Sequence, residues 1–176
     1  MHNARTHSRR RALVAAAAAL VTAGAVVAYA AADSPTERNT RLNGTFTTTL
    51  RAINNQIGTY GIEQAIVKGS GTVERFGRAT VTTGITQDRT ATPCGAGSSV
   101  DQSTSRIVTG RGKLILRLSG TRCFDRDGTE LSRGTYVVDG KASSGVFAGA
   151  TGDGESKAVI GSPSTVTFTG KLKVAS

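Results

Sequence analysis

Residues 165–174 have the sequence TVTFTGKLKV, in which polar and apolar side chains alternate. Val166, Phe168, Leu172 and Val174 fall on one side of an extended chain, and the threonines and lysines between them fall on the other. This period of two predicts a β-strand with one face packed on a core and one face in water.

The same alternation continues through most of the chain. Residues 78–85 and 113–119 place Val, Ile and Leu on one face and Thr, Arg, Lys and Ser on the other. Further strands are predicted over residues 45–50, 62–67, 71–76, 105–109, 130–138, 145–148 and 155–160. A helix is expected only over residues 50–57, for at most two turns, because Gly58 and Gly61 follow.

Glycine separates these segments. Tight hairpin turns are predicted at Asp127-Gly128, Asp139-Gly140 and Asp153-Gly154. Many strands with short connections indicate an all-β fold. We expect an antiparallel β-barrel of about eight strands, since closure removes exposed sheet edges. A two-sheet β-sandwich is the alternative.

The N-terminus has the pattern of a targeting segment. Residues 1–11 carry four arginines and no acid, residues 12–28 are mostly Ala, Val and Leu, and small residues follow at 28–32. These features predict a secretory signal peptide over residues 1–32, cleaved after Ala30 or Ala32. The run SRRRAL at residues 8–13 also resembles a twin-arginine signal, so the export route stays open. A permanent N-terminal membrane anchor is the alternative reading.

The predicted cleavage divides the chain into three parts. A flexible leader follows over the polar residues 33–43, and a single barrel domain occupies residues 44–176. No membrane span is expected after cleavage. We therefore expect an extracellular protein, secreted or associated with the cell wall.

Cleavage also changes the composition. Residues 1–32 hold four of the 22 basic residues and no acid, so 18 basic and 12 acidic residues remain, a net charge of +6. Met1, His2 and His7 are also removed, which leaves no histidine. A Ser-His-Asp triad and a His-ligated metal site are thereby excluded from the exported chain. Its arginines are dispersed and its aromatics few, so nucleic acid is not an expected partner.

Two cysteines, Cys94 and Cys123, lie in the exported part. An even number of cysteines outside the cell predicts a disulfide, and neither a C-x-x-C pair nor a histidine is present to activate a thiol. The bridge is expected to hold the loop around Cys94 against the strand that contains Cys123.

Other residues bear on chemistry. Asp125 and Asp127 lack the further ligands of a calcium loop and indicate a solvated hairpin, so no metal is expected. Gly-x-Gly pairs occur at residues 69–71, 95–97, 110–112 and 152–154, and none of them precedes a predicted helix. A phosphate-binding glycine loop opens a helix, so no nucleotide cofactor is expected. Acid–base catalysis without histidine would depend on carboxylates or tyrosines in a dry cavity. The candidates are Tyr60, Glu63, Glu74, Glu130 and Tyr136.

Residues 145–154, GVFAGATGDG, are the most distinctive segment. They resemble the G-x-F-x-G-A-x-G-x-G stretch of secreted actinobacterial proteins with an allene oxide cyclase or dirigent-like barrel. The resemblance implies an eight-stranded antiparallel barrel with a central cavity, often in homo-oligomers. In this segment, Phe147 is expected to anchor the interior, while Gly145, Gly149 and Gly152 allow the chain to bend around it.

Three functions follow from these observations. The first is non-catalytic binding of a small apolar ligand, or a structural role at the cell exterior. The second is a cofactor-free isomerase or cyclase of the allene oxide cyclase or dirigent type. The third is a protein-interaction module that acts through the polar loop 88–105.

Overall fold

A computed structural model describes residues 37–54 and 62–175 of the chain. The predicted signal peptide and Tyr60 lie outside these residues. Nine strands are present in them: β1 (Glu37–Asn54), β2 (Ile62–Val73), β3 (Gly77–Asp88), β4 (Ser99–Thr109), β5 (Gly112–Phe124), β6 (Glu130–Val138), β7 (Ser144–Gly145), β8 (Asp153–Val159) and β9 (Ser164–Ala175).

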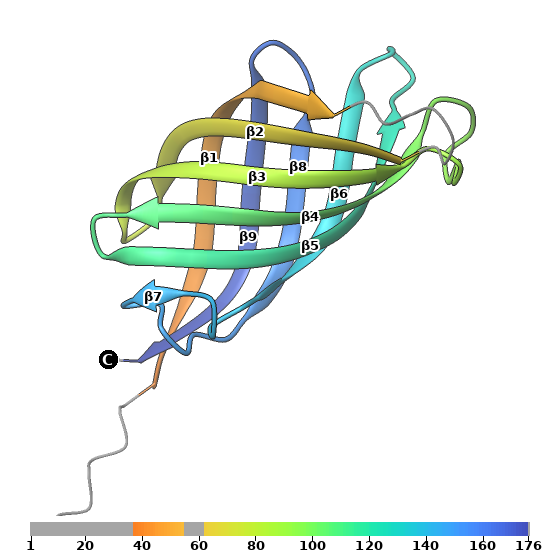
Figure 1. The fold of residues 1–176 in the computed structure, drawn as a ribbon. Helices are drawn as coiled ribbons and strands as arrows, with labels where there is room; N and C mark the ends of the chain where they lie inside the picture. Colours follow the sequence, from red (N-terminus) through yellow and green to blue (C-terminus); the bar gives the residue numbers. More distant parts are fainter. Residues whose placement is uncertain (1–36, 55–61, 176) are drawn as a thin grey trace, which may run out of the picture. The chain divides into compact units, whose positions relative to one another are not determined.

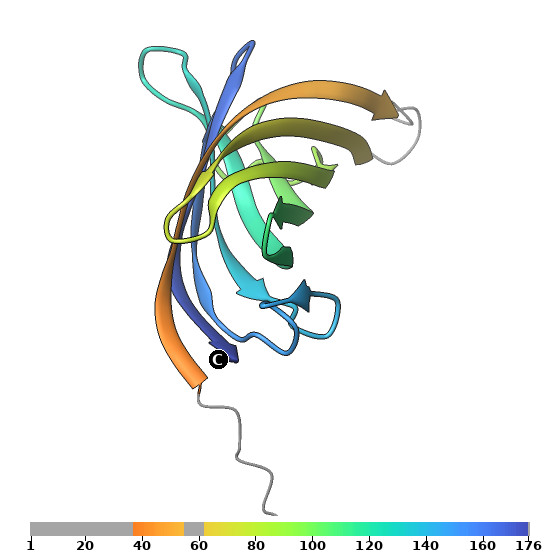
Figure 2. The ribbon, with the colours of Figure 1, turned by 90° about the vertical axis from the view of Figure 1, so that its left-hand side faces the viewer.

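The strands form one closed antiparallel barrel (Figure 1). Going round the barrel, β1 pairs with β2, β2 with β3, β3 with β4, β4 with β5, β5 with β6, β6 with β8, β8 with β9, and β9 with β1. The two-residue strand β7 is an addition to β5 and takes no part in the closure. Figure 2 shows the strands curving around a shared interior. The prediction of an all-β, eight-stranded barrel is confirmed, and the β-sandwich is not what forms.

The alternation of side chains explains why these residues form a barrel. In β5, Leu114 and Leu116 point inward and are almost fully buried, whereas Arg117 is exposed. In β9, Phe168 and Leu172 are buried in the same way between exposed threonines and lysines. Strands of this kind remove an apolar face from water, which is the main stabilising contribution to the domain. The inward face of β4 is the exception, because Ser99, Asp101 and Ser105 are buried there.

Two predictions about the N-terminal part are wrong: the flexible leader over residues 33–43 and the helix over residues 50–57. Residues 37–43 belong to β1 and pair with β9 from Glu37 opposite Ala175 to Asn43 opposite Thr169. Arg38, Asn39, Arg41 and Asn43 are exposed, and Leu42 faces the core at 1% exposure. The described part of the predicted helix, residues 50–54, is also strand, because it continues to pair with β2 across a bulge between Leu50 and Ala52.

Three predictions in the second half also need correction. The segment 145–148 is a turn rather than a strand, apart from Gly145 in β7. Asp153-Gly154 begins β8, and Asp139-Gly140 opens a 14-residue excursion, residues 139–152, instead of a tight hairpin.

The predicted loop 88–105 is shorter: β3 includes Asp88 and β4 begins at Ser99, so the connection is 89–98. Only Asp127-Gly128 lies in a hairpin turn as expected, with Gly128 N–H donating to the Asp125 carbonyl at 3.0 Å.

Candidate ligand-binding cavity

The barrel interior is divided into a filled half and a hollow half. The filled half lies at the end that holds the β2–β3 and β4–β5 turns. Four aromatic side chains pack there almost without exposure, and Phe46 and Tyr136 both contact the ring of Phe168, at centroid distances of 5.9 and 6.2 Å. The fourth, Phe147, lies 4.8 Å from the ring of Phe76. Aromatic contacts of this kind stabilise the filled half beyond the burial of apolar area alone.

The excursion over residues 139–152 closes this end (Figure 1). It carries the distinctive glycine-rich segment and places Phe147 in the core at 1% exposure. Gly145 has a φ of +65°, and a Cβ there would collide with the Arg111 carbonyl oxygen. Gly149 and Gly152 also have positive φ angles, so the chain turns back on itself around Phe147.

The hollow half contains a cavity of about 220 Å³ that opens at the other end of the barrel. Its wall on β1, β8, β9 and the β8–β9 connection carries an apolar patch of Leu50, Ile53, Ala158, Ile160 and Val166, with Thr48, Ser156, Lys157 and Ser164 beside it. Its wall on β2 to β6 is largely polar. A ligand of about ten non-hydrogen atoms fits a space this size, because a dry cavity of about 150 Å³ already accepts benzene.

A polar belt runs along the second wall and consists of Glu63, Gln87, Asp101, Arg122 and Ser132. The strand register places Glu63 opposite Gln87, Gln87 opposite Asp101, and Arg122 opposite Ser132. These side chains therefore lie side by side across five neighbouring strands. Asp101 is 5% exposed and Gln87 is 1% exposed, so the belt is part of the interior and not of the outer surface.

Arg122 is the centre of the belt. Its Nε lies 3.5 Å from Asp101 Oδ2, and its Nη1 donates to Glu130 Oε1 at 3.1 Å. The Gln87 amide oxygen, in the orientation that satisfies both ends of the amide, accepts from Arg122 Nη2 at 2.6 Å and from Nε at 2.9 Å. Buried charges need such pairing, because an isolated guanidinium in this site would lose its hydration without compensation.

Glu63 is held separately at the edge of the belt. Its Oε2 accepts from Arg89 Nε at 2.8 Å and lies 2.7 Å from Arg89 Nη2. The Glu63 side chain is 9% exposed, whereas that of Arg89 is 43% exposed. The carboxylate is thus an interior group whose counter-ion reaches in from the rim of the barrel.

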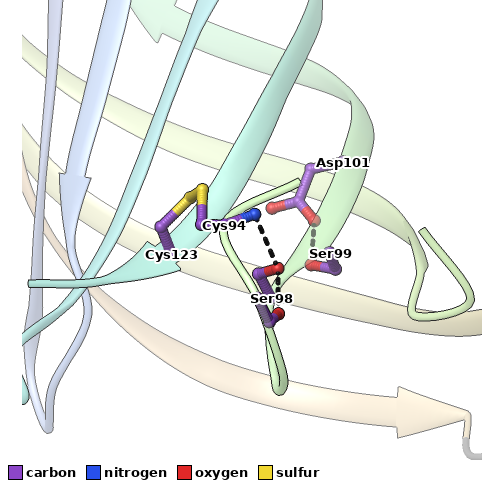
Figure 3. The surroundings of a disulfide bond; sticks show 6 residues. Cys94, Ser98, Ser99, Asp101 and Cys123 are labelled. Carbon is purple, nitrogen blue, oxygen red and sulfur yellow. Dashed lines mark hydrogen bonds between the residues drawn. A yellow bond between two sulfur atoms is a disulfide. The ribbon is translucent and has the colours of Figure 1, made fainter. Parts of the chain in front are cut away.

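The disulfide joins the 89–98 connection to the cavity wall (Figure 3). Cys94 and Cys123 are bonded, with their Cα atoms 5.7 Å apart. Ser98 Oγ accepts from the Cys94 N–H at 3.1 Å, and the neighbouring Ser99 Oγ donates to Asp101 Oδ1 at 2.8 Å. The disulfide therefore ties the connection to β5 at Cys123, the residue that follows Arg122, and Ser99 at the start of β4 bonds to Asp101 of the belt. The binding of a protein partner by the 89–98 connection stays a prediction.

The structure separates the candidate catalytic residues. Glu63 lines the cavity, and Glu130 supports Arg122 from the rim. Glu74 lies at the filled end, exposed, and accepts from Asn43 Nδ2 at 3.3 Å. Tyr136 lies in the filled half, where burial and then the nearby Asp153 raise the pKa of its hydroxyl to about 12. Neither Glu74 nor Tyr136 borders the cavity.

Four belt residues were not predicted: Gln87, Asp101, Arg122 and Ser132. One signal was present in the sequence for Arg122, because it continues the inward alternation of Leu114, Leu116 and Leu118. A charged residue at an inward position of a strand either has a partner inside the barrel or faces a cavity. Within the described residues, no cluster of three metal-ligating side chains is present, and no helix is long and apolar enough to cross a bilayer.

Comparison with protein-family models and with curated proteins gave no match. Among solved structures, the chain is similar to a protein described as a nonspecific heme-binding cyclase that catalyses a (4 + 2) cycloaddition during neoabyssomicin biosynthesis. The sequence identity is 9% and the TM-score 0.43, over 79% of this chain and 65% of that chain. This chain therefore spans less than two thirds of that protein, and a similarity this low carries no conclusion about function. The resemblance to allene oxide cyclase and dirigent-like proteins stays a prediction beyond the barrel itself.

Proposed function

We propose that this protein is exported and that its barrel binds a small molecule without transforming it. The observation that carries the proposal is the open cavity with one apolar wall and one polar belt. A pocket of this construction buries the body of a ligand and fixes its orientation with a few polar groups. The expected ligand is therefore amphipathic rather than purely apolar.

Export is part of the proposal and is supported by two observations. Residues 1–32 have the composition of a signal peptide, and the Cys94–Cys123 bond is of the kind that persists in oxidising compartments. The test is to express the full chain in a secreting host and sequence the N-terminus of the released protein. A mature chain that begins at Ala31 or Asp33 is the expected result, and retention of the full chain in the membrane contradicts it.

The binding test uses phenylpropanol, which has an aromatic body and a hydroxyl head. A ligand of about ten non-hydrogen atoms should bind with a Kd between tens of micromolar and millimolar, on the order set by usual ligand efficiencies. Titration calorimetry and chemical-shift changes in the domain measure the affinity and locate the ligand.

A variant that fills the cavity makes the test specific. Ala65 lines the cavity at 8% exposure, so Ala65→Phe should abolish binding of phenylpropanol. Ala52 lies on the neighbouring strand β1 and is exposed, so Ala52→Phe makes the same change outside the cavity and should leave binding intact. Saturable binding that survives Ala65→Phe would place the ligand elsewhere and overturn the assignment of the cavity.

A cofactor-free isomerase is the second candidate, because Glu63 places a buried carboxylate on the wall of the cavity. A carboxylate in that position can remove a proton from a bound ligand and return it to another carbon. The test is incubation with a β,γ-unsaturated ketone and measurement of the conjugated isomer. Conversion that disappears in Glu63→Gln favours the enzyme, and recovery of unchanged ketone favours the binding role.

A further inference from the structure

We infer that the cavity selects ligands whose polar end donates hydrogen bonds, with a cationic head preferred, and that Glu63 Oε1 receives that head. The inference rests on the proposed binding function and specifies the chemical class of the ligand. It depends on which polar atoms of the wall are already occupied and which are still available.

Glu63 offers an acceptor to the cavity. Both of its contacts with Arg89 use Oε2, and among the described residues Oε1 has no partner. The residue is 7% exposed overall and borders the cavity, and its second oxygen keeps contact with solvent there. A carboxylate oxygen without a donor in such a place favours a ligand that supplies one.

The donors of the belt are occupied. Arg122 directs its nitrogens to Gln87, Asp101 and Glu130, and Asp101 accepts from Ser99 Oγ as well. A ligand carboxylate would have to displace one of these partners and leave it buried without a donor. That displacement is unfavourable because a buried charge left without a partner has lost its solvation with nothing to replace it.

The position of one charge around the cavity also favours a cation. The belt and its partners hold three carboxylates, those of Glu63, Asp101 and Glu130, and two guanidiniums, those of Arg89 and Arg122. Their sum is one negative charge. Lys157 also borders the cavity, but it belongs to the outward, exposed set of β8. With Lys157 counted, the charges around the cavity balance, so the preference for an ammonium comes from the position of the Glu63 carboxylate on the wall and not from the net charge.

The hydroxyls of the wall do not reverse this selection. Thr83 Oγ1 and Ser105 Oγ bond to each other at 2.8 Å. Other lining hydroxyls, among them those of Thr48, Ser103 and Ser119, can accept as well as donate, so they serve either kind of head group. The apolar wall opposite accommodates a ring or short chain. The expected ligand is thus a compact apolar body that carries one amine or hydroxyl.

The experiment compares three probes with the same body: phenylpropylamine, phenylpropanol and phenylpropanoate. Their affinities for the complete exported chain are measured by calorimetry at neutral pH. We expect the amine to bind at least tenfold more tightly than the acid, with the alcohol between them. An acid that binds as tightly as the amine overturns the inference.

Variants assign the preference to Glu63. Glu63→Gln should bring the affinity for the amine down to that for the alcohol. Arg89→Ala removes the competing guanidinium from the exposed rim and should increase the preference for the amine. Glu74→Gln is the matched control, because Glu74 is a carboxylate of the same domain at the filled end. Circular dichroism and thermal unfolding establish that each variant is folded.

The outcomes separate the two proposals. If none of the three probes binds the wild-type protein, the binding function itself fails. If all three bind with equal affinity, the cavity binds ligands but the selection by head group is wrong. The last outcome concerns Glu63 itself. If the wild-type protein binds the amine more tightly than the acid and Glu63→Gln binds it with the same preference, the ammonium does not bind at Glu63. The inference as stated is then overturned, whatever the effect of Arg89→Ala.

Discussion

Replacement of Arg122 by methionine should destabilise the domain far more than the same replacement of Arg117. Both arginines lie on β5 and each pairs with an aspartate. They differ in their surroundings: the Arg122 side chain is 15% exposed and its partner Asp101 is 7% exposed, whereas the Arg117 side chain is 65% exposed. The two replacements share the residue type and the strand, so a difference in their effect on stability reports the difference in burial.

The magnitude follows from what each replacement leaves behind. Without Arg122, the buried carboxylate of Asp101 loses its counter-ion and keeps only hydroxyl donors such as Ser99 Oγ, and the amide oxygen of Gln87 loses its donor. Removal of one partner of a buried ion pair costs about 3–5 kcal/mol, much of it from the charge that is left unpaired. Arg117→Met removes a largely exposed arginine from Asp139, whose side chain is 16% exposed and still accepts from the Ala142 N–H, and should cost clearly less, as ion pairs at the surface contribute little.

Urea unfolding of the oxidised protein, followed by circular dichroism, measures both free energies of unfolding. The double variant Arg122→Met with Asp101→Asn tests the reason. It should lose less stability than the sum of the two single variants, because the second change removes the charge stranded by the first. If Arg122→Met costs no more than Arg117→Met, the belt is not a structural network and the reasoning is refuted.

Three further perturbations have defined outcomes. Replacement of Cys94 and Cys123 by serine opens a loop with a sequence separation of 29 and should lower the free energy of unfolding by about 3–4 kcal/mol in the chain-entropy model; equal urea midpoints with and without reductant would contradict it. Phe147→Ala should cost about 3–5 kcal/mol through the cavity it leaves at the filled end, and a loss below 1 kcal/mol, by the same urea assay, would show that the excursion does not close the barrel. Tyr136 has a raised pKa of about 12 in the folded protein against 10.0 in an ordinary tyrosine, so the folded state keeps a proton that the unfolded chain releases. Its stabilising effect is complete below pH 10 and is lost as the pH rises to about 12, and Tyr136→Phe should therefore flatten the fall in stability over that range.

The fold could be predicted because the inward positions of most strands are apolar. Phe168 and Leu172 in β9, and Leu114 and Leu116 in β5, all occupy the buried face that their alternation indicates. Residues 37–43 escaped this reasoning because only Leu42 faces the core there, and a single apolar residue makes no pattern.

The candidate site was predicted only in part, for a different reason. Glu63 was named from its chemistry, but nothing in the chain between residues 63 and 122 indicates that Glu63, Gln87, Asp101 and Arg122 become neighbours. That depends on strand register across five strands. Tyr136 was named for the same chemistry and lies in the wrong half, because the sequence does not reveal which end the 139–152 excursion fills.

The pairing of β1 with β9 has a practical consequence for handling the protein. Glu37 lies opposite Ala175, so both ends of the described chain leave the barrel at the filled end, away from the mouth of the cavity (Figure 1). A tag, a carrier domain or a surface linker joined before residue 37 or after residue 175 is therefore attached at the filled end. A protein immobilised through either terminus should present the open end of its barrel to the solution. An N-terminal or a C-terminal fusion is therefore equally suited to surface-based ligand screening.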